Sequence, residues 1–96
     1  MLTITPVARQ AIESLLDRGR GRGGDGGIRI ARHWSVAAGE AALWFTLESL
    51  PASGDEVIVQ QGARVFLAPE AAPFLEDMVL DALVEETSVE FRISER

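Results

Sequence analysis

Hydrophobic positions recur with a helical period at the start of the chain. After the β-like run 2–4, Thr5 is a good N-cap and Pro6 suits the first helical position, where its missing N–H costs nothing. The apolar positions that then fall on one helical face are Val7, Ala11, Ile12, Leu15 and Leu16. This pattern predicts a helix over about 6–18 that is ended by Gly19.

From residue 28 onward the hydrophobic period changes from helical to that of β-strands. Six runs rich in β-branched, aromatic or alternating apolar residues predict strands, at 28–32, 43–48, 57–59, 64–67, 79–84 and 89–93. In the second run, Leu43, Phe45 and Leu47 share one face. The connections are predicted at 35–40, 51–55, 60–63 and 85–88, and the runs on either side of 60–63 form a hairpin. Pro69 and Pro73 favour one short helix near 70–76.

These elements predict one domain over residues 1–96 with an α+β, mainly β fold. The order is strand, helix, several strands, short helix and two strands. The connections are too short for repeated parallel crossovers, so we expect a largely antiparallel sheet or sandwich. No internal repeat and no second domain is evident.

The net charge and the hydropathy limit the classes of partner and the cellular compartment that we expect. The net charge is −6, and residues 35–96 carry three arginines against twelve carboxylates. Such a surface repels phosphate over most of its length, which argues against general nucleic-acid binding. No apolar run approaches the roughly 20 residues of a membrane span, and the N-terminus lacks the pattern of a signal peptide. We expect a cytoplasmic protein without a membrane partner.

The segment 19–27 alternates arginine with glycine, and we expect it to form a flexible loop. It matches G-x-G-x-x-G formally, but it lies between a helix and a following strand, the reverse of a dinucleotide-binding turn. Arg18, Arg20 and Arg22 allow RNA binding as an alternative, through phosphate contacts and stacking. We interpret the segment as a solvated linker, because it holds no aromatic residue and the domain is acidic.

The chain has no cysteine, which excludes thiol chemistry, disulfides and thiolate-held clusters. His33 is the single histidine, and no H-x-E or H-E-x-x-H spacing joins it to Glu40 or Glu48. We interpret His33 as a surface residue at a strand end. Trp34 and Trp44 could line a pocket, although we expect at least one of them in the core. The sequence therefore predicts no catalytic, cofactor-binding or metal-binding residue.

The C-terminal region is rich in carboxylates but lacks a calcium-binding pattern. These residues are Glu76, Asp77, Asp81, Glu85, Glu86 and Glu90. Their spacing does not match D-x-D-x-D-G. We interpret them as exterior charges of strands and turns, where they discourage edge-to-edge aggregation.

Read from end to end, the chain resembles the HesB/IscA family of A-type iron–sulfur carriers. The resemblance is carried by the order and spacing of the segments 2–6 with its helix, 27–30, 51–57, 62–67, 69–75, 80–81 and 91–93. It covers about the whole chain. It implies the HesB-like fold, a mixed or antiparallel β-sandwich with an N-terminal helix.

The resemblance also implies a cluster site that this sequence does not keep. Family members bind clusters or iron with three cysteines, one in the loop after the second strand and two in a C-terminal Cys-Gly-Cys. The first position falls near Val36-Ala37-Ala38, which offers no ligand, and the sequence stops at Arg96 before a C-terminal pair. We expect all three ligands to be lost, and we transfer no functional residue from the family.

Three functional hypotheses follow. The first is a non-enzymatic HesB-like interaction module that binds an unknown protein partner or a second copy of itself. The second is an accessory protein of iron–sulfur cluster assembly whose ligands come from a partner. The third is a binder of a small ligand near His33, Trp34 and Glu40, or of RNA through the Gly/Arg loop.

Overall fold

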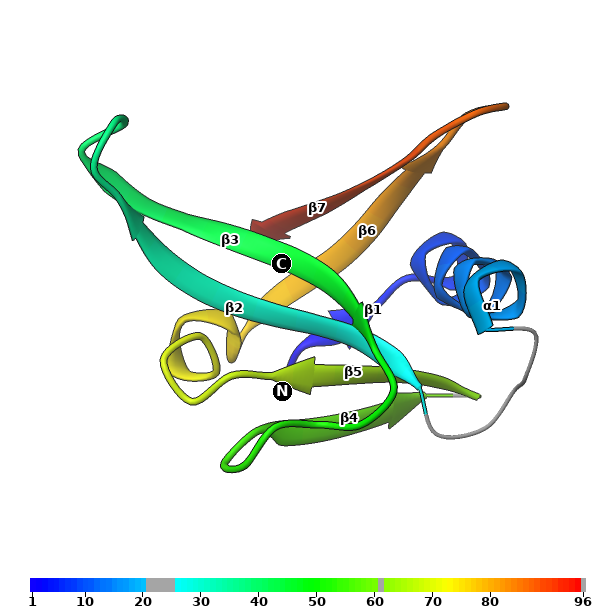
Figure 1. Cartoon of the computed structure of the whole chain (residues 1–96), viewed down its shortest axis with the longest axis horizontal. Helices are drawn as coiled ribbons and strands as arrows, with labels where there is room; N and C mark the ends of the chain where they lie inside the picture. Colours follow the sequence, from blue (N-terminus) through cyan, green and yellow to red (C-terminus); the bar gives the residue numbers. More distant parts are fainter. Residues whose placement is uncertain (21–25, 61, 96) are drawn as a thin grey trace.

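The computed structural model of the chain describes residues 1–20, 26–60 and 62–95, the side chains of residues 18–20 excepted. Two sheets face each other, and one helix lies at the end of the sandwich (Figure 1). The elements in chain order are β1 (Thr3–Ile4), α1 (Pro6–Arg20), β2 (Gly27–Ser35), β3 (Glu40–Glu48), β4 (Glu56–Gln60), β5 (Ala63–Leu67), the 3-10 turn η1 (Pro73–Leu75), β6 (Met78–Val84) and β7 (Val89–Glu95).

Both sheets are mixed, and each contains one parallel pair. The three-stranded sheet has the order β1-β6-β7, and the four-stranded sheet has the order β3-β2-β5-β4. β1 runs parallel to β6, β2 runs parallel to β5, and the other neighbours are antiparallel. The predicted α+β, mainly β class is confirmed. The two parallel pairs arise because distant parts of the chain return to one sheet, which does not require repeated βαβ units.

The N-terminal helix forms for the predicted reasons, but its end and its buried face differ from the prediction. The Ala8 backbone N–H donates to the Thr5 hydroxyl over 3.1 Å, so Thr5 caps the helix. The buried face is centred on Ala8, Ile12 and Leu16, whereas Val7 is exposed. The predicted end at residue 18 is wrong by two residues, since helix boundaries fray and glycine is tolerated in a last turn.

The predicted Gly/Arg loop falls partly in regular structure and partly outside the described residues. Gly19 and Arg20 belong to α1, and Gly27 belongs to β2. At Gly27 a side chain is excluded, because a Cβ there would lie 2.6 Å from the Arg64 carbonyl oxygen of the neighbouring strand β5. Residues 21–25 lie outside the described residues.

β2 and β3 are longer than their hydrophobic patterns predict. They pair antiparallel from Gly27 opposite Glu48 to Ser35 opposite Glu40, so the predicted connection at 35–40 contracts to the turn 36–39. Residues 32–34 are exposed on both faces, and the sequence therefore shows no alternation there. In this part of the hairpin the strands are held together by backbone pairing, because their side chains are not buried.

The remaining elements follow the sequence closely. β4 and β5 form the predicted hairpin, and Gly62 in its connection has a φ of 93°, a value that favours glycine. The predicted short helix near 70–76 is a single 3-10 turn that begins at Pro73. The last two strands pair antiparallel, as the pattern of their runs implies.

The core lies between the two sheets and α1. Its largest fully buried side chains include Leu2, Ile12, Ile30, Leu75 and Leu80, which come from β1, α1, β2, η1 and β6 or lie directly beside them. Side chains of β3, β6 and β7 pack against this core but remain partly exposed, namely Leu43, Phe45, Leu47, Met78, Ala82, Phe91 and Ile93. The sandwich is thus closed on the α1 side and less covered where β3 faces β7.

Candidate functional site

The β2–β3 hairpin carries the largest exposed aromatic side chains of the described residues. Trp34 is 68% exposed and Trp44 is 58% exposed, while Val36 in the turn is 88% exposed. The prediction that one tryptophan lies in the core is therefore wrong. The hairpin extends beyond the facing sheet (Figure 1), so its far residues have nothing to pack against.

The two tryptophans lie on opposite faces of this hairpin. Trp34 pairs with Ala41 and shares its face with Arg32. Trp44 pairs with Ala31 and shares its face with His33, whose ring makes an edge contact with it at a centroid distance of 5.5 Å. The surface made by Trp34, Val36 and Trp44, called the hairpin surface below, can therefore contact a partner from two sides.

The predicted pocket residues do come together, although in an open depression. His33, Trp34 and Glu40 line a hollow of about 470 Å³ with Glu70. His33 is exposed, as predicted, and the hollow combines one imidazole with two carboxylates. Across residues 1–20, 26–60 and 62–95, no three histidine, cysteine or carboxylate side chains lie close enough to hold a metal ion.

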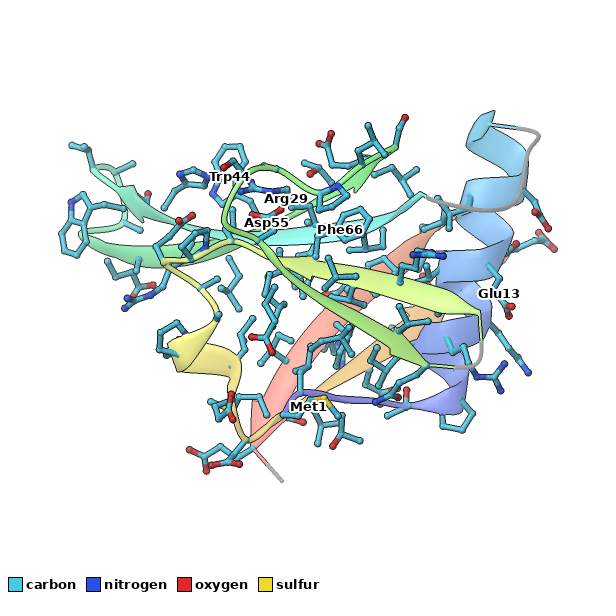
Figure 2. All side chains as sticks on the ribbon, turned by 90° about the horizontal axis from the view of Figure 1, so that it is seen from below. Met1, Glu13, Arg29, Trp44, Asp55 and Phe66 are labelled. Atoms are coloured by element: carbon cyan, nitrogen blue, oxygen red, sulfur yellow. The ribbon has the colours of Figure 1, made fainter. Side chains whose placement is uncertain are left out.

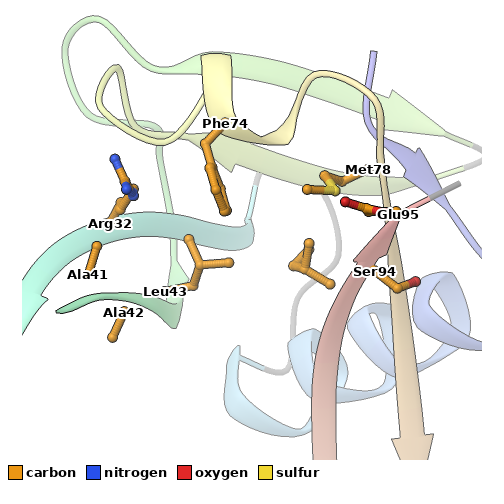
Figure 3. A pocket seen from close by; sticks show the side chains of 9 residues that line it. Arg32, Ala41, Ala42, Leu43, Phe74, Met78, Ser94 and Glu95 are labelled. Atoms are coloured by element: carbon orange, nitrogen blue, oxygen red, sulfur yellow. The ribbon is translucent and has the colours of Figure 1, made fainter. Parts of the chain in front are cut away.

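A second cleft lies between the turn-side half of the β2–β3 hairpin, η1, the start of β6 and the end of β7 (Figure 3). Its volume is about 310 Å³. Leu43, Phe74 and Met78 give it an apolar lining, and Arg32 and Glu95 add opposite charges. The Arg32 guanidinium lies 4.9 Å from the centre of the Phe74 ring, a cation–π contact. The cleft can accept an apolar side chain from a partner.

The sequence reasoning missed an ion pair on the outer face of the four-stranded sheet. The Arg29 guanidinium donates to both oxygens of Asp55, over 2.9 and 3.0 Å, and the Ala52 N–H donates to the same carboxylate. The side chain of Asp55 is 0% exposed and that of Arg29 is 24% exposed, although the Asp55 residue as a whole is only half-buried. The hydrogen bonds from Arg29 hold the pKa of Asp55 below its usual range, and Asp55 raises the pKa of Arg29.

This pair fixes the connection 49–55 to the sheet. Arg29 on β2 is directly opposite Phe66 on β5, so both side chains point to the outer face (Figure 2). Phe66 is 1% exposed although it is not part of the core between the sheets. We attribute its burial to the connection that Asp55 anchors. The role of the Arg29–Asp55 pair is structural. In the sequence, the alternation of apolar and charged residues in 28–32 indicated that Arg29 faces outward, but nothing indicated its partner.

The alternative of RNA binding concerns side chains that the structure leaves out. The side chains of Arg18, Arg20 and Arg22 are not among the described ones, so this hypothesis stays a prediction.

The C-terminal carboxylates of the sequence analysis are all exposed. Within the described ranges, no helix is long and apolar enough to cross a membrane.

Comparison with solved structures places the chain among known folds. Over 99% of its length and 85% of the other chain, it superposes on a crystal structure of IscA with the [2Fe-2S] cluster, with a TM-score of 0.79 and 28% identity. The chain has a HesB/IscA-like fold. It also matches Escherichia coli SufA, involved in biosynthesis of iron–sulfur clusters, with a TM-score of 0.79, 23% identity and coverage of 98% of this chain and 79% of SufA.

A third structure supports the fold at greater sequence distance. An Aquifex aeolicus protein solved by NMR matches with a TM-score of 0.68 and 17% identity, over 99% of this chain and 91% of that chain. No protein-family model matches the sequence. No curated protein matches it either. The chain is therefore a divergent, cysteine-free form of the HesB/IscA-like fold.

The residues of this HesB/IscA-like chain do not fit an iron–sulfur cluster. The turn where the resemblance places the first cysteine consists of Val36-Ala37-Ala38 and Gly39, and all four residues are exposed. Aliphatic side chains offer no ligand to iron, and the sequence holds no thiol elsewhere. Val36, a residue of the hairpin surface, therefore lies where the resemblance places the first cysteine ligand.

Proposed function

We propose that this chain is a non-catalytic, cytoplasmic protein-interaction module of the HesB/IscA type that binds its partner through the hairpin surface. One observation carries the proposal: Trp34, Val36 and Trp44 are exposed together on a hairpin whose turn cannot hold a cluster. Tryptophan is enriched among the residues that dominate binding energy at protein interfaces.

The geometry supports docking at the hairpin better than catalysis. The His33 ring contacts the Trp44 ring, and among the described residues it makes no hydrogen bond to a nucleophile or a carboxylate. The two tryptophans stand on different faces, and the adjoining cleft of Figure 3 offers an apolar lining. A partner that closes around the hairpin would cover both rings and fill this cleft. Iron–sulfur cluster assembly is the context we propose, because IscA and SufA share the fold.

Replacing Trp34 or Trp44 by alanine is expected to weaken partner binding about 30-fold or more, since truncating such an anchor costs roughly 2 kcal/mol or more. The measurement is capture from native lysate with quantitative mass spectrometry, followed by titration of the captured partner. Leu50→Ala is the matched control, because Leu50 is 67% exposed but lies beyond the opposite end of β3. An unchanged partner profile for both tryptophan variants, with circular dichroism unaltered, would refute the hairpin as the docking site.

A second candidate is an accessory role in cluster assembly in which the partner supplies the ligands. Anaerobic reconstitution with iron and sulfide is expected to give no visible-band chromophore on the isolated protein, because it contains no thiol. If the captured partner gains a chromophore faster or more stably with this chain present, the accessory role is supported. A stable chromophore on the isolated chain would contradict both hypotheses.

A further inference from the structure

The helix α1 carries two apolar rows, and the core is built mainly from the first. The first row consists of Ala8, Ile12 and Leu16, which are all buried. The second row lies beside it at the same spacing of four residues and consists of Val7, Ala11 and Leu15. Val7 is 46% exposed and Leu15 is half-buried. The second row is therefore an apolar surface that the described residues cover only in part.

The second row forms one wall of a surface pocket, called the helix–turn pocket below. The other wall is the turn between β6 and β7, where Val84 and Val89 pair at the ends of the two strands. Val84 is 53% exposed. The pocket lies on the α1 side of the molecule, away from the turn of the β2–β3 hairpin (Figure 1), and its volume is about 370 Å³. A volume in this range, with mainly apolar walls and a few polar groups, is typical of sites for small molecules.

The rim of the helix–turn pocket is polar, and one charged group lines it among the described residues. The neutral polar residues of the lining are Gln10, Ser14, Thr87 and Ser88. The charged residue is Glu85, which is exposed. The Ser88 hydroxyl donates to a Glu85 carboxylate oxygen over 3.3 Å, and no arginine or histidine among the described side chains lies within 4 Å of this carboxylate. Glu85 can therefore accept a hydrogen bond from a cation that enters the pocket.

We propose that the helix–turn pocket binds a small primary amine whose body is aliphatic or aromatic. The body packs between the second apolar row of α1 and the two valines of the β6–β7 turn. The ammonium group stays at the rim, where it donates to the Glu85 carboxylate and keeps contact with water. Burial of the apolar body provides most of the affinity. The ion pair is exposed to solvent, so it adds a smaller part and selects the charge of the ligand.

Charge and size separate this ligand from the alternatives. A ligand with a carboxylate would place like charges together at the rim, in a chain whose net charge is already −6. A partner protein is disfavoured by size, because a stable interface covers roughly 800 Å² on each side. From Val7 to Leu15 the second row extends about 12 Å along the helix axis. A wall of this length offers enough contact to a small molecule but not to a protein.

The test compares the probes n-hexylamine, n-hexanol and hexanoate by NMR titration of the isotopically labelled full chain. n-Hexylamine is expected to shift the amide signals of Val7, Leu15, Val84 and Val89 in a saturable way. n-Hexanol is expected to bind the same residues about threefold more weakly, because it lacks the ion pair, and hexanoate more weakly still. Glu85→Gln is expected to lower the affinity for n-hexylamine to that for n-hexanol and to leave the affinity for n-hexanol unchanged.

A matched pair of valine variants tests the apolar wall. Val84→Thr keeps the shape of the side chain but replaces a methyl group by a hydroxyl group. It is expected to weaken the binding of n-hexylamine and of n-hexanol alike, by about threefold. Val59→Thr is the control, because Val59 is 54% exposed on β4 and does not line the pocket. Far-ultraviolet circular dichroism verifies that each variant is folded.

Three results would overturn the proposal. The first is the absence of saturable shifts at the helix–turn pocket. The second is equal affinity of n-hexylamine for the original chain and for Glu85→Gln, or hexanoate binding as tight as that of n-hexylamine. The third is a set of shifts spread over the exposed carboxylates and unchanged by Val84→Thr, which would indicate general attraction to an acidic protein. Trp34→Ala is expected to leave n-hexylamine binding unchanged, so failure at this pocket does not affect the hairpin surface.

Discussion

Phe66→Ala is expected to lower the free energy of unfolding by about 3 to 4 kcal/mol, the usual cost of removing a buried phenylalanine ring. Phe66 is 1% exposed but lies on the outer face of the four-stranded sheet, away from the core between the sheets. The ring is almost fully buried, so its removal leaves a cavity that the surrounding residues can fill only in part. Urea denaturation followed by circular dichroism measures the change.

Phe74→Ala is the matched control for this prediction. Phe74 is also a phenylalanine, but it is 46% exposed and lies over the cleft of Figure 3. Its removal is expected to cost about 1 kcal/mol, because much of the ring already contacts water. Equal losses for the two variants would mean that Phe66 contributes no more to the fold than an exposed ring.

Asp55→Ala is expected to cost about 2 to 3 kcal/mol, because it leaves the Arg29 guanidinium without a carboxylate and the Ala52 N–H without an acceptor. The cost is below that of a fully buried pair, since Arg29 is 24% exposed. The effect is not expected to add to that of Phe66→Ala. Both substitutions act on the same connection, so a double-mutant cycle should give a coupling energy above the experimental error.

The pH dependence of this contribution has a definite sign. The pKa of Asp55 is lowered in the folded protein by its bonds with Arg29, so the pair stabilises the fold fully above the ordinary aspartate pKa. This stabilisation is lost as the pH falls through the folded pKa. The stability difference between the original chain and Asp55→Asn is therefore expected to be constant at neutral pH and to shrink in acid.

Denaturation at a series of pH values checks this dependence. The pKa of Asp81 is lowered as well, by the Thr5 hydroxyl and the Ala82 N–H, so the original chain loses stability in acid at more than one carboxylate. Asp77→Asn is the control, because Asp77 is exposed and its substitution is expected to change stability by less than about 0.5 kcal/mol. A difference for Asp55→Asn that persists unchanged into strong acid would contradict the assignment of the pair.

The sequence predicts elements whose signals are local. Thr5 and Pro6 identify the helix start, and the glycine in 60–63 identifies the β4–β5 hairpin, since caps and turns depend on neighbouring residues. The far half of the β2–β3 hairpin has no such signal. His33 and Trp34 are exposed together, so the alternation that indicates a half-buried strand disappears there.

Features that depend on topology were not accessible from the sequence. Arg29 and Asp55 are 26 positions apart, and their contact requires the return of the chain along the outer face of the sheet. The size of tryptophan favoured burial, but Trp34 lies near the turn of the hairpin, beyond the facing sheet, and Trp44 opposite Ala31 points to the outer face of the four-stranded sheet. The sequence thus named His33, Trp34 and Glu40, which share one hollow, as an alternative pocket, but it did not predict that both tryptophans are exposed.

The turn 36–39 gives this protein a convenient position for a spectroscopic label. Gly39 has a φ of 69°, and a Cβ built there meets no atom within 4 Å, so the turn stands in open space. Because the chain contains no cysteine, Val36→Cys would create a unique attachment point for a dye or a spin label. A label at this position sits beside the proposed docking surface, and its signal would report the arrival of a partner directly.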